Sequence, residues 1–204
     1  MVEVDRREPR ANRSVKFALA ASTMLVVLAG SVTGLGFAGC ARIEGAPGSP
    51  KSGGGRATEF TARDIDGKTV RLSDYLGKQA VLLDFCATWC QPCLAELSHL
   101  RRLYAKEKHR GFVVLAIAMD SSDTVAEVPA WARRNSLDFP VLLDEDSHIA
   151  GVYNPKKSAP LTVLIDKKGE ITYVHDGYNP GDEVTLEQHV AAVLDAVDAG
   201  ATPK

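Results

Sequence analysis

The chain has 204 residues, of which 45% are hydrophobic, 25% charged and 6% aromatic. This balance excludes a collagen-like or wholly disordered chain, and the length allows one domain of common size with an additional segment, or two small domains. The formal charge of -2 provides no global positive field, so we predict that the protein does not bind nucleic acid.

The first forty residues predict export. A basic leader ending at Lys16 precedes residues 17–39, in which no side chain is charged. That stretch is long enough to cross a bilayer core of about 30 Å, and its positive flank should stay in the cytoplasm. Residues 1–40 are therefore predicted to be a signal peptide or a retained signal anchor. Either alternative places the protein in the cell envelope, membrane-anchored, with the rest of the chain facing the periplasm or the outside.

The end of this segment predicts a lipid anchor. Phe37-Ala38-Gly39-Cys40 resembles the bacterial lipobox, in which small residues precede a cysteine that becomes diacylated, although Phe37 stands where leucine is usual. We predict lipidation of Cys40. Residues 41–57 are rich in Gly, Pro and Ser and predict a flexible linker.

Residues 58–200 predict one α/β domain. Alternating segments on both sides of Asp66-Gly67 indicate a β-hairpin. Continuous apolar runs at 80–86 and 112–119 indicate strands buried on both faces. Further strands are expected at 139–143, 161–165 and 170–175, and helices at 94–108, 125–134 and 183–197. This order predicts a mixed sheet flanked by helices, with an N-terminal β-hairpin extension.

A pair of cysteines opens the first predicted helix. Cys90-Gln91-Pro92-Cys93 directly follows a buried strand. The free N–H groups and partial positive charge of a helix start stabilise a thiolate, so Cys90 is predicted to be the nucleophile. Cys93 lies one turn further on the same side, where it can resolve a mixed disulfide. The alternative is an inert structural disulfide or two unreactive core thiols.

Asp84 interrupts the apolar strand before these cysteines. Because an unpaired buried carboxylate costs several kcal/mol, Asp84 is expected to be protonated or to serve a function. One possibility is that it takes the proton from Cys93, and the other is that it points to a wet edge of the strand. Glu96 is interpreted as a charge on the helix face that could tune the site, and His99, His109 and His189 are interpreted as solvated.

The segment 81–93, VLLDFCATWCQPC, resembles the thioredoxin superfamily. The preceding residues 60–75 narrow this resemblance to the exported TlpA/ResA-like thiol–disulfide oxidoreductases, and residues 159–169 resemble the family's segment with a cis-proline. The resemblance implies a thioredoxin-like fold and a redox-active Cys90–Cys93 pair.

The same resemblance implies further site residues. Asp84 matches the buried acid of thioredoxins, and Pro160 matches the cis-proline beside the cysteines. In that family the backbone at the position of Ala159 pairs with an extended peptide, and we assign Trp89, Ala159 and Pro160 to substrate binding.

The resemblance also implies partners and a direction of reaction. The partners would be substrate proteins with disulfides or thiols and a membrane electron-donor thiol protein. A reductase role is implied, for example in cytochrome c maturation, with no cofactor and no metal.

Cys86 stands where the family usually has tryptophan. It is expected to be a small buried residue, with metal binding or a regulatory disulfide as alternatives. A Sco-like copper chaperone would use Cys86, Cys90 and either His148 or His175 as ligands. A radical-SAM iron–sulfur site, a peroxiredoxin and a binding module without turnover remain as further alternatives.

Overall fold

The structure is a computed structural model that describes residues 54–200, without the side chains of 197–200. Residues 1–40, with Cys40, and most of the predicted linker lie outside the described residues. Within 54–200, no helix is both long and apolar enough to cross a membrane.

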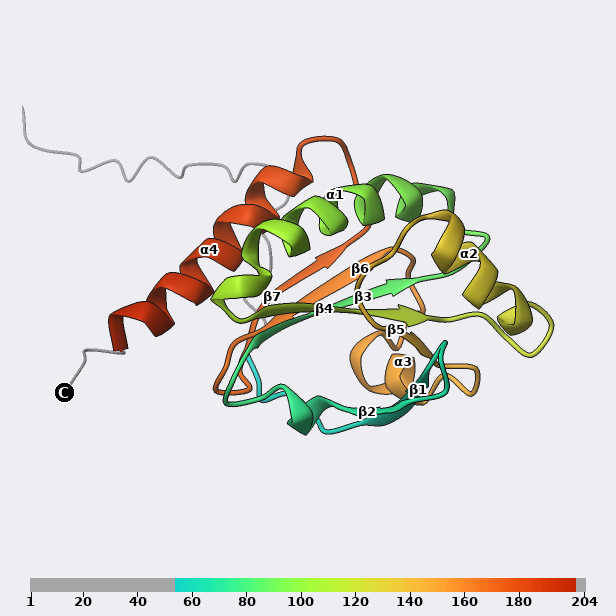
Figure 1. The fold of residues 1–204 in the computed structure, drawn as a ribbon, viewed down its shortest axis with the longest axis horizontal. Coiled ribbons are helices and arrows are strands. Elements are labelled where there is room, and N and C mark those ends of the chain that lie inside the picture. Colours follow the sequence, from blue (N-terminus) through green and yellow to red (C-terminus); the bar gives the residue numbers. More distant parts are fainter. Residues whose placement is uncertain (1–53, 201–204) are drawn as a thin grey trace, which may run out of the picture. The chain divides into compact units, whose positions relative to one another are not determined.

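Seven strands form one mixed sheet in the described part of the chain, in the order β2-β1-β5-β4-β3-β6-β7 (Figure 1). Their bounds are Thr61–Asp64 (β1), Thr69–Arg71 (β2), Ala80–Cys86 (β3), Phe112–Ala118 (β4), Val141–Leu143 (β5), Leu161–Ile165 (β6) and Ile171–Asp176 (β7). The central β3 pairs parallel with β4 and antiparallel with β6. The predicted mixed sheet and the N-terminal hairpin of β1 and β2 are confirmed.

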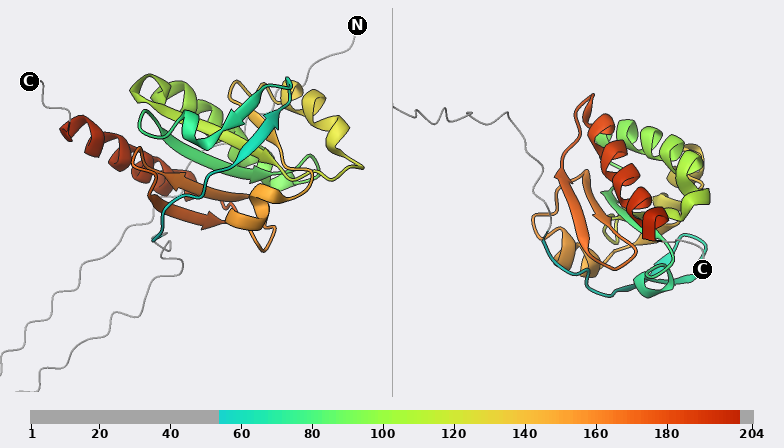
Figure 2. Two further views of the ribbon diagram at one scale, coloured as in Figure 1. Left: turned by 90° about the horizontal axis from the view of Figure 1, so that it is seen from below. Right: turned by 90° about the vertical axis from the view of Figure 1, so that its left-hand side faces the viewer.

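Helices flank this sheet. Their bounds are Gln91–Glu107 (α1), Val128–Arg134 (α2), His148–Tyr153 (α3) and Asp182–Gly200 (α4), with short 3-10 turns at Leu72–Asp74 (η1), Lys108–Arg110 (η2) and Val125–Glu127 (η3). Figures 1 and 2 show α1 and α4 alongside each other on one face, with α3 on the opposite face. The right-hand view of Figure 2 looks along this two-helix layer.

The alternation of side chains along β3 builds a core on each face of the sheet. Leu82 and Cys86 point into the core that contains α1, α2 and α4, whereas Leu83 and Phe85 point into the opposite core. Since successive side chains of a strand alternate, Asp84 lies on the face covered by α1. Full burial of each leucine contributes roughly 1.5–3 kcal/mol, so both faces hold β3 in this register.

The short helix α3 was not predicted from the sequence. The Asp144 carboxylate accepts the backbone N–H groups of Ile149 and Ala150, each at 2.8 Å. A carboxylate at a helix start satisfies free N–H groups and favours the helix dipole. Because α3 has only six residues, it is too short to show a helical period in the sequence.

Candidate active site

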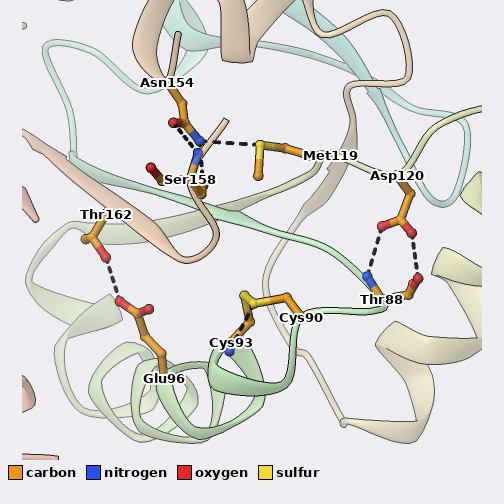
Figure 3. Close-up of a disulfide and its surroundings, with 9 residues drawn as sticks. All are labelled: Thr88, Cys90, Cys93, Glu96, Met119, Asp120, Asn154, Ser158 and Thr162. Atoms are coloured by element: carbon orange, nitrogen blue, oxygen red, sulfur yellow. Dashed lines mark hydrogen bonds between the residues drawn. A yellow bond between two sulfur atoms is a disulfide. The ribbon is translucent and has the colours of Figure 1, made fainter. Parts of the chain in front are cut away.

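The cysteine pair forms a disulfide at the start of α1 (Figure 3). Cys90 is the N-cap residue, with an extended backbone, and its sulfur accepts the backbone N–H of Cys93 at 3.3 Å. Pro92 lies in the first turn, where its missing N–H removes no helical hydrogen bond. Cys90 is only 4% exposed and Cys93 is fully buried, so a partner can reach only the first sulfur.

This position favours a thiolate at Cys90 in the reduced state. The N–H of Cys93 already points at the Cys90 sulfur, and the first turn of α1 contains no acidic residue that would oppose a negative charge. A helix start of this kind lowers the pKa of a cysteine thiol. The structure therefore gives the two sulfurs different accessibility and different backbone surroundings.

Two other parts of the chain, Trp89 and the loop with Ala159 and Pro160, lie next to the disulfide. Trp89 precedes Cys90 and is 60% exposed, although large aromatic side chains are usually buried. The Ala159–Pro160 peptide bond is cis, and the Pro160 carbonyl accepts the N–H of Gly177 at 2.8 Å. Ala159 packs against the core that contains both cysteines, so the loop before β6 lies beside the site.

A buried carboxylate holds the turn that leads into Cys90. Asp120 follows β4 and is fully buried, and it accepts the N–H of Thr88 at 3.0 Å and the Thr88 hydroxyl at 2.5 Å (Figure 3). The neighbouring Met119 donates its N–H to the Cys86 carbonyl at 2.8 Å. These contacts bind the end of β4 to the active-site turn at three points.

A buried amide holds the loop before Pro160. The Asn154 side chain donates to the Ser158 carbonyl at 2.7 Å and accepts the Ser158 N–H at 2.9 Å. Its amide nitrogen also lies 3.4 Å from the sulfur of Met119 (Figure 3). Met119 and Asp120 are consecutive, so the end of β4 contacts the groups that fix both loops beside the disulfide. Sequence reasoning missed Asp120 and Asn154.

Two carboxyl groups lie on the other side of the site. Asp84 is fully buried, and neither of its oxygens has a hydrogen-bond partner among the residues that the structure describes. Burial raises its pKa well above the usual range, and the charge of nearby Glu96 raises it further. The alternative that Asp84 points to a wet strand edge is therefore wrong.

Glu96 was interpreted as a charge on the helix face, and that interpretation is wrong. Its side chain is 3% exposed, because it lies one turn after Cys93 on the face of α1 that packs on the sheet. Its Oε1 accepts the Thr162 hydroxyl at 2.6 Å, and Thr162 pairs with Asp84 across β3 and β6. Burial raises the pKa of Glu96 to about 7, against the lowering effects of the Thr162 hydrogen bond and the His175 charge. We call Asp84 and Glu96 the acid pair.

The three histidines that were interpreted as solvated differ in their exposure. His109 is exposed, as expected, and His189 is half-buried and stacks on Tyr173 with ring centroids 4.3 Å apart. His99 was expected to be solvated but is 4% exposed, because it lies on the sheet side of α1. Burial lowers its pKa.

Cys86 is the one free cysteine among the described residues, and it is fully buried. Burial raises the pKa of its thiol well above the usual range, and the charges of Asp84 and Asp120 raise it further. Across residues 54–200, no three His, Cys, Asp or Glu side chains are grouped so that they could hold a metal ion. Cys86 is thus a small buried thiol in the core, as expected.

A groove in the described residues lies away from the cysteines. It has a volume of about 840 Å³ and runs between β1, β5 and α3, with Arg63, Asp144 and His148 among its lining residues. Disulfide exchange with a protein takes place at an exposed edge and needs no deep pocket, so we place the site at Cys90 and not in this groove.

Comparisons with known proteins agree with this geometry. Residues 54–174 match the model described as the AhpC/TSA family. The chain is 34% identical over 140 residues to the "Thiol-disulfide oxidoreductase ResA" of Geobacillus kaustophilus, covering 69% of this chain and 77% of that protein.

Solved structures give the same result. A provisionally assigned thiol:disulfide interchange protein DsbE from Chlorobium tepidum is 32% identical with a TM-score of 0.64, covering 72% of this chain and 99% of that chain. A secreted Mycobacterium tuberculosis disulfide oxidoreductase homologous to Escherichia coli DsbE is 26% identical with a TM-score of 0.55, covering 65% of this chain and 95% of that chain.

Proposed function

The chain belongs to the AhpC/TSA family and is a ResA-like thiol–disulfide oxidoreductase, and we propose that it reduces protein disulfides outside the cytoplasm from a membrane-tethered position. The observation that carries the proposal is the Cys90–Cys93 disulfide at the start of α1, in which Cys90 is 4% exposed and Cys93 is fully buried. Assembly of proteins such as c-type cytochromes, which requires reduced cysteines, is the process we assign to it. A membrane thiol protein would return the pair to its reduced state.

Reduction begins at Cys90. Its thiolate attacks one sulfur of the substrate disulfide, a mixed disulfide forms, and the other substrate sulfur leaves with the electron pair. Cys93 then attacks the Cys90 sulfur, which restores the Cys90–Cys93 bond and releases the second substrate sulfur. The Cα atoms of the pair are 5.4 Å apart, so Cys93 reaches Cys90 without movement of the helix.

The acid pair takes the proton of Cys93. Cys93 is fully buried, so its thiol cannot pass a proton directly to water. Asp84 lies on the face of β3 that α1 covers, and Glu96 lies one turn beyond Cys93 on that helix. The pKa of Glu96, raised to about 7, lets this group accept and return a proton near neutral pH, which is the requirement for a general base or acid. Burial and the charge of Glu96 raise the pKa of Asp84 as well.

The substrate is held by backbone pairing. An extended peptide that carries the disulfide would add to the chain at Ala159 and Pro160, as a further strand. The exposed ring of Trp89 would cover the peptide's apolar side chains next to Cys90. Cys86 does not compete for the substrate, because it is buried and its raised pKa keeps the thiol protonated.

The chain would be organised in three parts. Residues 1–40 direct export, lipid on Cys40 or a retained helix anchors the protein, and residues 41–57 connect the anchor to a thioredoxin-like domain at 58–200. Fractionation of cells that express the wild-type chain and Cys40→Ala tests the anchor. Loss of the Cys40→Ala chain from the membrane fraction supports the lipid, and unchanged membrane attachment supports the retained helix.

Trapping the intermediate tests the function. Cys93→Ser should accumulate a mixed disulfide between Cys90 and one sulfur of a peptide disulfide substrate, since the resolving thiol is absent. Cys90→Ser should form none, and Cys86→Ser should turn over like the wild type. Accumulation at any cysteine other than Cys90 would contradict the proposal.

Asp84→Asn tests the proton step. We expect attack by Cys90 to change little, whereas release of the mixed disulfide slows by about 100-fold, the range for loss of a general base. Rapid-quench measurement of the mixed disulfide separates the two steps. Unchanged release would show that Asp84 does not take the proton.

A further inference from the structure

A small cavity lies beside Glu96, on the side of α1 that faces β7 and α4. Its volume is about 10 Å³ for the centre of a water-sized sphere, which is room for about one water molecule. Polar side chains from α1, β6, β7 and the start of α4 line it, among them Glu96, His99, Thr162, His175, Tyr178 and Asp182. A polar cavity needs about this volume, and two to four polar partners, to hold one water molecule.

Two of these polar groups, Glu96 and His99, each have a buried atom without a hydrogen-bond partner among the described residues. Glu96 uses Oε1 to accept the Thr162 hydroxyl, but its Oε2 is buried and has no hydrogen-bond partner within residues 54–200. A buried carboxyl oxygen without a partner costs roughly 1–3 kcal/mol, which one bridging water removes. A water in the cavity therefore has a reason to bind at Glu96.

His175 connects the cavity to solvent. It lies on β7 directly across from Thr162 on β6, and its side chain is 27% exposed. Its Nε2 lies 2.9 Å from Oδ2 of Asp182, which orients the ring and leaves the other ring nitrogen for a second partner. Asp182 is itself fixed, since it also accepts the N–H of Asn179 at 2.7 Å.

We propose that the cavity holds a water molecule and that this water and His175, positioned by Asp182, form the path by which the proton of Cys93 leaves the buried acid pair for solvent. The path rests on the proposed function, because it serves the proton that the resolving step releases. A histidine with one exposed edge exchanges protons with solvent, whereas Asp84 and Glu96 have no exposed oxygen of their own.

The resolving step transfers the proton of the Cys93 thiol to the acid pair. The Cys93 S–H bond breaks as its sulfur bonds to Cys90, and the Cys90–substrate bond breaks with its electron pair on the substrate sulfur. The proton passes from the acid pair to the cavity water, from there to His175, and from His175 to solvent. The substrate thiolate takes a proton from solvent, so no oxidant or further reductant is needed. In the reverse direction the same path supplies the proton to Cys93.

Charged groups surround this path on every side. They are Asp84 on β3, Glu96, His99 and Arg102 on α1, His175 on β7, and Asp182 and Glu183 at the start of α4. The rim is closed by Tyr178, whose hydroxyl donates to Glu183 at 3.1 Å. His99 is the competing exit, because it lines the same cavity, but its Nε2 is buried and lies 3.5 Å from Glu187.

Chemical rescue tests the path in the full-length chain kept in mild detergent. The reduced chain is mixed with a peptide disulfide, and release of the mixed disulfide is timed by rapid quench in weak buffer over a range of pH. His175→Ala should slow release by at least about tenfold, and imidazole in the buffer should restore the rate by entering the space left by the ring. His175→Gln keeps a hydrogen bond to Asp182 but cannot relay a proton, and it should be equally slow.

Equilibrium and control measurements separate this path from a structural effect. The midpoint of the Cys90–Cys93 couple in glutathione buffers should stay unchanged in His175→Ala, because a proton path alters rates and not equilibria. His109→Ala, which removes an exposed histidine in the 3-10 turn η2 after α1, should behave like the wild type. If His175→Ala releases the mixed disulfide at the wild-type rate, or if imidazole does not restore a slowed rate, the proposed path is wrong. Slowing in His99→Ala alone assigns the exit to His99 and also overturns it. A wild-type chain that forms no mixed disulfide overturns the proposed function itself.

Discussion

Buried polar groups flank the disulfide on two sides, and they differ in how completely they are hydrogen-bonded. On one side, Asp120 after β4 and Asn154 after α3 have both polar atoms of their side chains hydrogen-bonded, to Thr88 and Ser158 respectively. On the side covered by α1, Asp84 has no hydrogen-bond partner in the described part of the chain, and Glu96 uses only one of its oxygens.

This difference separates positioning from proton transfer. A buried polar group whose bonds are all made fixes geometry, because any movement would leave a donor or acceptor unpaired. A buried carboxyl without partners costs stability, but its pKa moves to where it can exchange protons. We therefore propose that the fully hydrogen-bonded side positions the substrate surface and that the acid pair serves the buried sulfur.

Removal of Asp120 should have the largest effect on stability. Asp120→Ala leaves the Thr88 N–H and hydroxyl without their acceptor, and we expect a loss of about 4 kcal/mol, since hydrogen bonds to charged groups contribute about 1.5–3 kcal/mol each. Asp120→Asn can keep both bonds with its oxygen and amide and should lose less than half as much. Urea unfolding of the oxidised chain measures both. Equal losses in the two variants would show that charge, and not positioning, is the contribution of Asp120.

Glu96→Gln should increase the free energy of unfolding, and only above acidic pH. Because the folded-state pKa of Glu96 is raised from 4.5 to about 7, the folded chain holds a proton that the unfolded chain has lost between these values. Stability of the wild type therefore falls as pH rises through this window and then levels off. Glu96→Gln removes this pH-dependent loss of stability. The gain in unfolding free energy over the wild type should therefore grow from near zero at the lower end of the pH window to roughly 3 kcal/mol above its upper end. A constant difference across urea titrations at several pH values would contradict the raised pKa.

Asn154→Ala should have a smaller effect, on stability and on substrate affinity together. Loss of its bonds to Ser158 should cost about 2 kcal/mol and loosen the loop before Pro160, which raises KM for a peptide disulfide more than it lowers kcat. Asn135→Ala is the matched control, since Asn135 also bonds a backbone carbonyl but lies at the end of α2. An equal rise in KM for both variants would remove the positioning role of Asn154.

Ser158→Ala should have the smallest effect. The Ser158 hydroxyl donates to Asp176 at 3.1 Å in exposed surroundings, where such a bond contributes about 0.5 kcal/mol. Turnover and the urea midpoint should both stay close to the wild type. A large loss of activity would mean that the loop is fixed by this exposed bond rather than by Asn154.

The strands, their positions along the chain and the cysteine pair could be predicted from sequence, because apolar runs and the Cys90–Cys93 spacing are local patterns. Glu96 could not be distinguished from a surface glutamate by residue type, yet the helical period that places Cys93 and Leu100 on the buried face also places Glu96 there. That signal was present and was outweighed by the expectation that glutamate is exposed.

Asp120 and Asn154 left no such signal. Each lies after a secondary-structure element. Asp120 bonds Thr88, which is 32 residues away in the sequence, whereas Asn154 bonds Ser158 within a short loop. Their function depends on the distance between chain segments, which only the fold supplies. The six residues of α3 are likewise fixed by Asp144 and not by a periodic pattern.

Mass-spectrometric mapping of alkylated cysteines, after the full-length chain is equilibrated in a series of glutathione buffers, tests the redox pair most directly. We expect Cys90 and Cys93 to lose their free thiols together in a single two-electron transition, while Cys86 stays a thiol throughout. Independent transitions at the two positions, or a disulfide that includes Cys86, would contradict the account.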